Sequence, residues 1–384
     1  MTTGSSRPTT FHRPPRAYPE PVPSHPLRIG PPPTVPPPPH YGVLQTLFPV
    51  VGGVGILGFA LVFGNSAFLW IAGAMITLLL LFSLGMRWSQ RRSVRKKAEA
   101  DARRYVDYLR ERDRELAQAG ELQRAALDRL YPDPGKLWTA VVKRRGVWER
   151  RPNHADFLHV RLGRGDVPLD RRVELDLGVN PLTEYQEGPL GEARGLVERR
   201  SVLHDEPVVV DLSGIGVLSV TGDRTRARAW TRGLMAQLAA FRSPHDLRLV
   251  TSFDPADAAE WEWAKWLPHQ RAERRRARDR VDGGGPPGSG TPILTFARSA
   301  AELDAMLDAE LRPRLEQLRR VAESGLAGRD VPLSAHTLVV VVDGFHPRHP
   351  AMQLPSFREL LARARELEAV LVLLVDERAF EPSE

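Results

Sequence analysis

The feature that most constrains this chain is a long uncharged stretch near its N-terminus. No Asp, Glu, Lys or Arg occurs from Tyr41 to Met86. A membrane-spanning helix needs about 20 apolar residues, so the stretch has room for two spans, near residues 44–63 and 67–86. The intervening Gly64-Asn65-Ser66 permits only a tight loop. The sequence therefore predicts an antiparallel two-helix transmembrane hairpin over residues 41–86.

The charges that flank this stretch predict its orientation. Arginines precede it in residues 1–40, and a dense group of arginines and lysines follows it from Arg87 to Lys97. Because basic residues favour the cytoplasmic side, both termini are expected in the cytoplasm of a multi-pass inner-membrane protein. The alternative, a buried core hairpin, requires a large surrounding domain that the flanking segments do not supply.

The segments on either side of the predicted hairpin are polar. Residues 1–40 are rich in proline and include Arg13-Pro14-Pro15-Arg16, which predicts a disordered arm that serves either for recognition or only as a solvated tail. Residues 87–130 are highly charged, with one narrow apolar stripe at helical spacing. This pattern predicts a helical stalk. The stripe is expected to pack on another protein or another copy, or else on the chain's own downstream domain.

The remainder of the chain has the pattern of an α/β protein. Residues 131–206 contain short candidate strands and predict a small β-rich connecting region. In residues 207–384 apolar strands alternate with helices, which is typical of a parallel sheet covered on both faces. Strands are predicted at residues 208–212, 217–221, 247–252, 293–296, 337–342 and 370–375, and helices at residues 225–241, 256–266, 300–322 and 356–367.

A phosphate-binding loop is suggested by the strand at residues 217–220, the turn at Gly222 and the helix that follows. The chemistry of such a loop is missing. Ala227, Arg228 and Ala229 stand where a P-loop has glycine, lysine and the hydroxyl that binds magnesium. An alanine side chain cannot ligate Mg²⁺, and a planar guanidinium does not replace a compact ammonium.

The second half of a P-loop site would be an apolar strand that ends in Asp-Glu. Here the strand ends in Asp343-Gly344, so the residue that would polarise the attacking water is absent. We therefore expect Gly222, Arg228 and Asp343 to form a degenerate, inactive nucleotide site, with no catalytic residue and no cofactor in this chain. His346 and His349 follow Asp343, but no fourth ligand is evident and no metal site is predicted.

Composition excludes several other classes of site. The chain has no cysteine, which rules out disulfides, thiolate catalysis and cysteine-based zinc sites. Its net charge of +7 comes mostly from arginine. One run, Arg271-Ala272-Glu273-Arg274-Arg275-Arg276, is the best candidate for binding nucleic acid, and a solvated arginine-rich loop is the other interpretation.

Several motifs together resemble the N-terminal part of EccC, the FtsK/SpoIIIE-type ATPase subunit of the actinobacterial type VII (ESX) secretion system. The resemblance covers essentially the whole chain and implies a degenerate RecA-like (FtsK/SpoIIIE-type) domain. The further ATPase domains of full EccC proteins are not present, so the chain resembles a fragment or one half of a split translocase. The motifs are Arg13-Pro14-Pro15-Arg16, Tyr131-Pro132-Asp133-Pro134, Val147-Trp148-Glu149-Arg150-Arg151-Pro152, residues 156–163 and residues 261–269.

The resemblance implies a function and a set of partners. It implies a membrane-anchoring and coupling part of a type VII translocase, with ATP and Mg²⁺ bound only in downstream or partner ATPase domains. Expected partners are the subunits EccB, EccD and EccE, an ATPase chain, and indirectly the secreted helical-hairpin substrates, in a hexameric assembly. The alternative function is that of an FtsK-type DNA translocase anchor.

Three closely spaced tryptophans are the candidates for contact with a partner or substrate. Trp261, Trp263 and Trp266 do not all share one face of a helix. We expect some of them in the core and one against a neighbouring domain or substrate, and core packing alone is the other interpretation.

Overall fold

The structure, a computed structural model, describes residues 13–37, 52–55, 58–59, 62, 66–273, 292–323 and 336–376. Contacts divide the chain into two compact units. The first unit comprises residues 1–20, 125–166 and 205–384, and the second comprises residues 21–124 and 167–204. Each unit is therefore built from segments that are distant in sequence. The division of the chain into five ranges made from the sequence stays a prediction.

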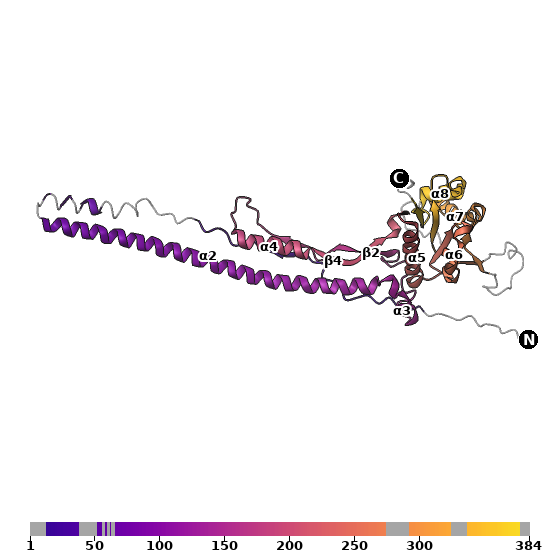
Figure 1. The fold of residues 1–384 in the computed structure, drawn as a ribbon, viewed down its shortest axis with the longest axis horizontal. Coiled ribbons are helices and arrows are strands. Elements are labelled where there is room, and N and C mark those ends of the chain that lie inside the picture. Colours follow the sequence, from indigo (N-terminus) through magenta and orange to yellow (C-terminus); the bar gives the residue numbers. More distant parts are fainter. Residues whose placement is uncertain are drawn as a thin grey trace, which may run out of the picture. The chain divides into compact units, whose positions relative to one another are not determined.

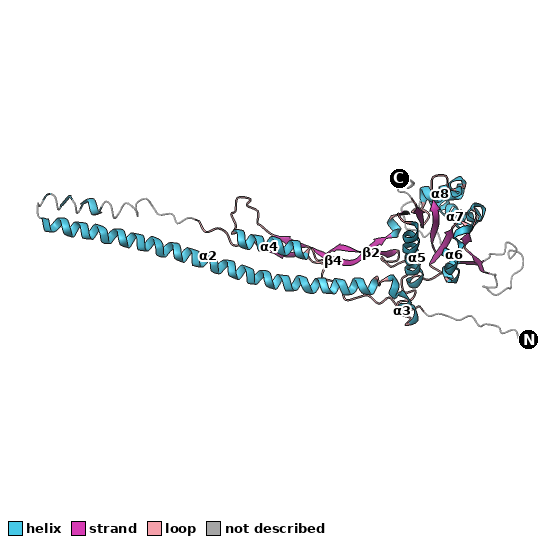
Figure 2. Ribbon diagram, in the orientation of Figure 1, coloured by secondary structure: helices cyan, strands magenta, loops and turns pink. Residues whose placement is uncertain are grey.

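A five-stranded parallel sheet forms the centre of the first unit (Figure 2). Its strand order is β5-β11-β10-β6-β9, and every neighbouring pair is parallel. The strands are β5 (Val217–Thr221), β6 (Leu247–Ser252), β9 (Phe296–Ala297), β10 (Thr337–Phe345) and β11 (Ala369–Val375). The predicted parallel sheet is present, and its central strands lie within one or a few residues of the predicted ranges.

Helices cover both faces of this sheet (Figure 1). Along β10, Val339 and Val341 pack in one apolar cluster with α5 (Arg224–Phe241), while Val340 and Val342 pack in another with α7 (Ala300–Glu323) and α8 (Pro355–Arg363). Successive side chains of a strand point to opposite faces, so an apolar strand buried on both sides needs two covering layers. That requirement explains the nearly continuous valine run of β10.

Short elements complete the first unit. The predicted strand at residues 208–212 is not part of the parallel sheet, because β4 (Val202–Asp211) pairs with β2 (His159–Pro168) in a separate two-stranded sheet. The predicted helix at residues 256–266 is broken into short turns of helix. The remaining elements are η1 (Pro134–Lys136), α3 (Leu137–Val142), η2 (Leu212–Gly214), η3 (Pro255–Asp257), α6 (Ala258–Trp261), η4 (Glu262–Trp266), η5 (Pro268–Gln270), β7 (Arg271–Glu273), β8 (Pro292–Leu294) and η6 (Pro350–Gln353).

The second unit is built on α2 (Ser66–Leu130), a helix of 65 residues. The other elements of this unit are β1 (Leu27–Ile29), β3 (Val173–Leu175), which pairs with β1 in parallel, and α4 (Glu187–Arg200). The apolar stripe of α2, including Tyr105, Leu109 and Leu116, is buried against apolar residues of the same unit such as Ile29 and Leu196. The expected packing on another protein or copy is thus replaced, for these residues, by packing within the chain.

One short stretch of the proline-rich arm, β1, is also packed. Ile29 is fully buried, and the hydroxyl of Tyr105 donates a hydrogen bond to the carbonyl of Gly30 at 2.8 Å. Leu27 and Ile29 alternate with an exposed residue, so β1 has one apolar face. That face packs in the apolar cluster of the second unit although the rest of the segment is polar. Composition is averaged over many residues and does not reveal an element of three residues, so it predicts a disordered arm throughout residues 1–40.

The transmembrane hairpin predicted from the uncharged stretch is wrong. Among the described residues, no helix has both the length and the apolarity that a membrane crossing requires. The second predicted span, residues 67–86, is the start of α2, which continues without a break into a charged helix. Most of the first span, residues 44–63, lies outside the described residues. The predicted multi-pass inner-membrane location rested on these spans and is wrong with them.

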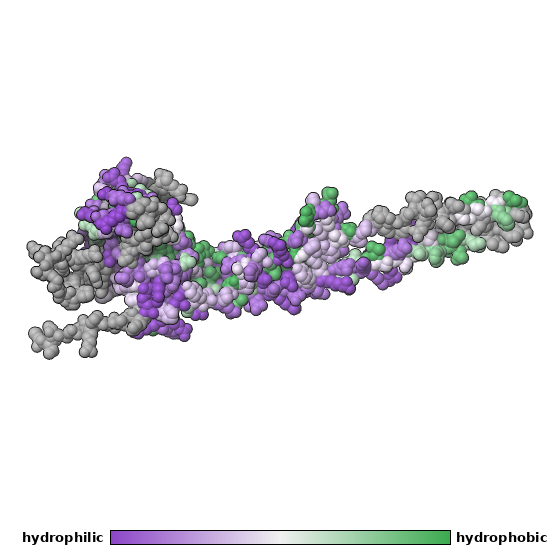
Figure 3. All heavy atoms as spheres, turned by 180° about the vertical axis from the view of Figure 1, so that it is seen from behind, coloured by the Kyte–Doolittle hydropathy of each residue, from purple (hydrophilic) through white to green (hydrophobic). Residues whose placement is uncertain are grey.

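The described side chains at the start of α2 are nevertheless apolar and exposed. Figure 3 shows apolar residues gathered at this end of the helix, whereas hydrophilic residues predominate farther along it. Trp70, Leu78, Leu81 and Phe82 each expose more than three-fifths of their surface. The second half of the uncharged stretch thus forms the apolar first part of one long helix, α2.

Candidate functional site: an ion-pair cluster beside the turn between β5 and α5

The turn between β5 and α5 lies where the sequence predicts a phosphate-binding loop, but it contains only Gly222 and Asp223, because α5 already begins at Arg224. Strand β5 ends at Thr221, Gly222 makes the turn, and Asp223 is the N-cap of α5. A carboxylate oxygen of Asp223 accepts a hydrogen bond from the backbone N–H of Arg226 at 3.0 Å. The exposed N–H groups at a helix N-terminus attract anions, and here the chain supplies that anion itself.

Gly222 is explained by backbone conformation alone. Its φ is +129°, a value that side-chain-bearing residues rarely adopt. No heavy atom lies within 4 Å of the position that a Cβ would take. The glycine therefore serves the turn itself, and a close approach of a ligand is not needed to account for it.

Arg228, which stands at the position of the P-loop lysine, is committed to two carboxylates. Its Nε donates a hydrogen bond to Oδ2 of Asp343 at 2.7 Å, and its Nη2 lies 2.7 Å from Oδ1 of Asp257. The side chains of Arg228 and Asp343 are 11% and 0% exposed. Burial opposes the charge of Arg228, but the hydrogen bonds and charges of the two aspartates outweigh it and raise the pKa of the guanidinium.

Asp343, at the end of β10, has two further partners. The indole Nε1 of Trp261 donates a hydrogen bond to its Oδ2 at 2.9 Å, and Nε of Arg224 lies 3.6 Å from its Oδ1. Arg224 also donates from Nη2 to Oδ2 of Asp257 at 2.9 Å. The carboxylate that would bind a metal in an intact P-loop site is thus held by one indole and two guanidinium groups.

Gly344 takes the position at which a P-loop site has its hydrolytic glutamate. Its φ is +69°, and a Cβ at this position would lie 2.7 Å from Nη2 of Arg224. A glutamate here would strain the backbone and would displace the end of the Arg224 side chain from its present position. The guanidinium of Arg224 lies where the side chain of a glutamate at position 344 would leave the backbone.

Together Arg224, Arg228, Asp257 and Asp343 form an ion-pair cluster, and Oδ1 of Asp376 lies 4.0 Å from Nε of Arg224 at its edge. The two guanidinium groups and two carboxylates join the start of α5, the end of β10 and η3. To admit a Mg²⁺–nucleotide, the cluster would have to give up buried ion pairs and leave charges uncompensated. The arrangement joins three elements of the first unit.

Comparisons with known proteins give one consistent relationship. Over 267 residues, or 69% of the chain, the sequence is 29% identical to the ESX secretion system protein EccC of Thermomonospora curvata. Over 169 residues, or 44% of the chain, it is 33% identical to the ESX-4 secretion system protein EccC4 of Mycobacterium tuberculosis. No protein-family model matches it. The chain is EccC-like. The resemblance to EccC that the motifs predicted is confirmed.

The EccC-like chain corresponds to a small part of these relatives. The matches cover 19% of the T. curvata protein and 13% of the M. tuberculosis protein. A solved structure, the cytoplasmic domain of the T. curvata type VII secretion ATPase EccC, matches at 17% identity over 64% of this chain and 23% of that one, with a TM-score of 0.34. That score is too low to support an argument about fold.

The three tryptophans of the EccC-like chain lie in different environments. Trp261 is fully buried beside Asp343, and Trp263 is partly buried against the same apolar cluster. Trp266 is 73% exposed, with Nζ of Lys265 lying 5.5 Å from the centre of its ring. Of the three, Trp266 alone presents a large surface to solvent, so the expected contact with a partner or substrate falls to this residue.

Sequence reasoning missed two members of the ion-pair cluster, Arg224 and Asp257. Arg224 is the first residue of α5, three residues before the position of the missing P-loop glycine. Asp257 lies at the end of η3, whose N-cap is Asp254. The sequence signal is the arginine at every second position at the start of α5, namely Arg224, Arg226 and Arg228. An arginine among them that is buried needs a carboxylate beside it. Which carboxylate that is depends on the tertiary fold.

Neither a metal site nor a nucleic-acid patch gains support from the described residues. No group of three or more His, Asp or Glu among them is arranged to hold a metal. The rings of His346 and His349 lie 5.7 Å apart, and Nδ1 of His349 accepts a hydrogen bond from the N–H of Ala351. The second half of the Arg271–Arg276 run lies outside the described residues.

Proposed function

We propose that this chain is a non-hydrolysing coupling component of a type VII secretion translocase. The observation that carries the proposal is the buried pair of Arg228 and Asp343, which joins the position of the P-loop lysine to the position of the metal-binding aspartate. In a working site the first group would bind the phosphates and the second would bind Mg²⁺, whereas here Arg228 and Asp343 neutralise each other. The EccC-like sequence supplies the biological setting.

In this proposal the hydrolysis of ATP takes place elsewhere. The curated relatives are several times longer than the part that this chain matches, and a solved structure of T. curvata EccC comprises its ATPases 2 and 3. ATP and Mg²⁺ would bind in such ATPase domains, on a longer form of this chain or on a partner. The α/β domain of this chain would pass mechanical or conformational changes between those ATPases and other components.

The proposed partners follow from the same relationship. They are the secretion subunits EccB, EccD and EccE and an ATPase chain, with a hexameric assembly and helical-hairpin substrates that contact the chain indirectly. Exposed apolar surface on a folded protein marks sites of interaction. Trp266 and the exposed residues at the start of α2 are therefore the surfaces proposed for these contacts.

Isothermal titration of the full chain with Mg-ATP tests the absence of a working nucleotide site. We expect no heat of binding up to millimolar nucleotide, because binding would have to separate buried ion pairs. Micromolar affinity for Mg-ATP, or turnover above the buffer rate, would overturn the proposal.

Affinity purification from the native cells after chemical crosslinking, followed by mass spectrometry, tests the coupling role. Recovery of other type VII subunits together with an ATPase polypeptide supports it. Recovery of DNA and chromosome-partitioning proteins in their place would favour the DNA-translocase alternative. A Trp266→Ala variant is expected to recover less of at least one partner, whereas Trp138→Ala, which removes an equally exposed tryptophan at another site, serves as the control.

A further inference from the structure

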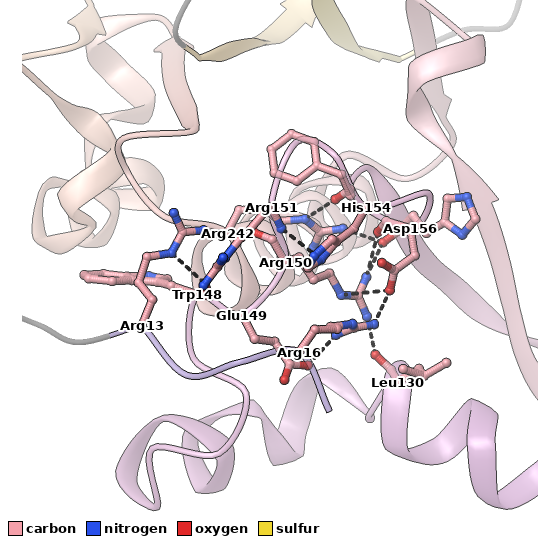
Figure 4. Close-up of polar contacts among 12 residues, drawn as sticks. Arg13, Arg16, Leu130, Trp148, Glu149, Arg150, Arg151, His154, Asp156 and Arg242 are labelled. Atoms are coloured by element: carbon pink, nitrogen blue, oxygen red, sulfur yellow. Dashed lines mark hydrogen bonds and ion pairs between the residues drawn. The ribbon is translucent and has the colours of Figure 1, made fainter. Parts of the chain in front are cut away.

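A short arginine-bearing segment of the N-terminal arm lies in a slot on the first unit. Figure 4 shows Arg13 and Arg16 reaching toward the polypeptide between Trp148 and Asp156. We call residues 13–18 the arginine segment. The arginine slot is the set of groups that contact it, namely Trp148, Glu149, Arg150, Asp156 and Asp246.

Arg13 is bound at one end of the slot by two carbonyls and a carboxylate. Its Nε donates to the carbonyl oxygen of Trp148 at 3.0 Å, and its Nη2 donates to the carbonyl oxygen of Arg150 at 3.2 Å. The same Nη2 lies 2.6 Å from Oδ2 of Asp246, whose side chain is 8% exposed. This set of acceptors is suited to the fork of donors on a guanidinium group.

Arg16 is bound at the other end by two carboxylates. Its Nη1 donates to Oε1 of Glu149 and its Nη2 donates to Oδ2 of Asp156. The side chain of Arg16 is only 4% exposed, although it belongs to a segment without helix or strand structure. The ring of Tyr18 lies 5.6 Å from the guanidinium carbon. Charge-assisted pairs of this kind are among the stronger polar contacts in proteins.

The spacing of the two arginines matches the conformation that the intervening residues prefer. Pro14 and Pro15 favour the polyproline II helix, which has three residues per turn and no internal hydrogen bonds. Residues separated by three positions therefore lie on the same side of the segment. Arg13 and Arg16 can enter one slot together with little loss of conformational entropy, because the prolines already restrict the backbone.

The slot is held in place by the first unit and not by the segment that fills it. The N–H of Trp148 donates to the carbonyl of Ala240 at 3.1 Å, and its indole Nε1 donates to the carbonyl of Ala239 at 3.0 Å. Arg150 is 1% exposed, and its Nη1 donates to the carbonyl of His159 at 2.9 Å. A preformed site of this kind needs little reorganisation on binding.

Charge makes the slot selective for a cationic ligand. Glu149, Asp156 and Asp246 contribute three carboxylates, while the buried guanidinium groups of Arg150, 3.6 Å from Asp156, and of Arg242 offset part of this charge. In the absence of the arginine segment, partly buried carboxylates would lack their main cationic partners. A peptide that enters the slot must therefore supply two positive charges at a fixed separation.

We propose that the arginine slot is a binding site for extended peptides of the type Arg-x-x-Arg, with the chain's own arginine segment as an exchangeable occupant. Residues 13–20 belong to no helix or strand, and side-chain contacts of two arginines attach them to the slot. Their release breaks no ladder of backbone hydrogen bonds. The same segment on a second copy of the chain has the same chemistry and can take its place.

A peptide titration tests the chemistry of the site. The probe is a fluorescent peptide with the sequence of residues 11–20, and the protein is the full chain with Arg13→Gln and Arg16→Gln, which vacates the slot. We expect saturable binding to this variant, and at least tenfold weaker apparent binding to the unmodified chain, whose own segment competes. Adding Asp246→Asn to the double variant is expected to weaken binding at least tenfold.

Two controls make the result decisive. A peptide with lysine at both arginine positions keeps the charge but lacks the guanidinium fork, so it is expected to bind at least fivefold more weakly. In a protein control, Asp205→Asn replaces Asp246→Asn, because Asp205 pairs with Arg164 away from the slot, and no loss is expected. Equal binding to the vacated and unmodified chains, or indifference to Asp246→Asn in a variant that keeps its native circular dichroism, would overturn the proposal.

The source of the bound segment is resolved by crosslinking a mixture of light and heavy isotope-labelled chains. Crosslinks that join a light segment to a heavy slot assign the occupant to a second copy, and single-isotope crosslinks assign it to the same chain. Either result supports a site for this segment. The absence of any crosslink between residues 11–20 and the slot in the unmodified chain would contradict it.

Discussion

At the scale of single residues, the ion-pair cluster decides what this domain can do. Arg228 and Asp343 are separated by 115 positions in sequence, yet their charged groups are 2.7 Å apart. Asp343 is fully buried and depends on cationic and hydrogen-bonding neighbours to compensate its charge. The cluster is therefore a structural element of the fold, and its members are expected to affect stability more than any chemical activity.

The first prediction concerns Arg228. Arg228→Ala is expected to lower the free energy of unfolding by about 3 kcal/mol, because it leaves a buried carboxylate with fewer partners. Arg232→Ala is the matched control on the same helix. Its pair with Glu260 is partly exposed, so a loss below about 1 kcal/mol is expected. Urea unfolding followed by circular dichroism measures both, and equal losses would count against a structural role for the cluster.

A second buried acid predicts how stability depends on pH. Burial by itself would raise the pKa of Glu310, but the hydrogen bond from His336 and the charge of Arg248 outweigh it and lower the pKa from 4.5 to about 2. A carboxylate with a lowered pKa in the folded state contributes stability above the unfolded value. That contribution is lost as the pH falls from about 4.5 toward 2.

Glu310→Gln is therefore expected to flatten the decline of stability between pH 4.5 and 2.5. The measurement is the urea midpoint at several pH values in this interval, for the unmodified chain and the variant. Glu316→Gln provides the control, because Glu316 is exposed and lies 3.5 Å from Arg320 in a solvated pair. An unchanged slope in Glu310→Gln would show that this acid does not contribute to the pH dependence.

At the scale of elements, α2 combines two surfaces of different character. Near its start apolar side chains are exposed, whereas farther along Tyr105, Leu109 and Leu116 are buried within the second unit. A pair between Asp113 and Arg200 of α4, at 2.6 Å, adds a polar contact to the buried stripe. The stripe therefore fixes the helix within its own chain and leaves the exposed residues for other contacts.

Two leucine substitutions in α2 separate these surfaces. Leu116→Ala is expected to cost about 2–5 kcal/mol, because the side chain is 1% exposed and its removal leaves a cavity. Leu84→Ala, the same change at a position 63% exposed, is expected to alter stability by no more than about 0.5 kcal/mol. If thermal unfolding shows comparable losses for both, the exposed part of α2 is covered in solution.

At the scale of the whole molecule, the chain is divided between two units that are each discontinuous in sequence. Units with separate cores unfold separately when few contacts couple them, and a two-state description then fails. We expect two transitions in calorimetry. Arg228→Ala should lower the midpoint of one and Leu116→Ala the midpoint of the other. A single transition that both substitutions shift equally would show that the units unfold together.

The alternating pattern of the C-terminal half was enough to predict the parallel sheet and the turn at Gly222. These features can be read locally, because a strand buried on both faces, such as β10, is a continuous apolar run and the helices between such strands are not. The ion-pair cluster could not be assembled in the same way, since Arg224 and Asp257 become neighbours of Asp343 only through the order of strands in the sheet. Pairings between residues so distant in sequence leave no local signal.

The errors have a physical origin as well. Hydropathy predicts two spans from the uncharged stretch because it counts apolar residues, whereas no helix among the described residues combines the length and apolarity of a span. The packing of β1 was missed because two apolar residues, Leu27 and Ile29, scarcely change the composition of a proline-rich segment. In both cases the prediction used a property averaged over many residues, and such an average does not show which contacts the individual residues make.

The attachment of the arginine segment also has a consequence for biosynthesis. Arg16 leaves the ribosome 133 residues before Glu149, one of the carboxylates that bind it. At about 5–20 residues per second, the segment waits on the order of ten seconds for its own slot to be made. During that interval the two arginines, separated by Pro14 and Pro15, can pair with other acidic surfaces before their own carboxylates have been synthesised.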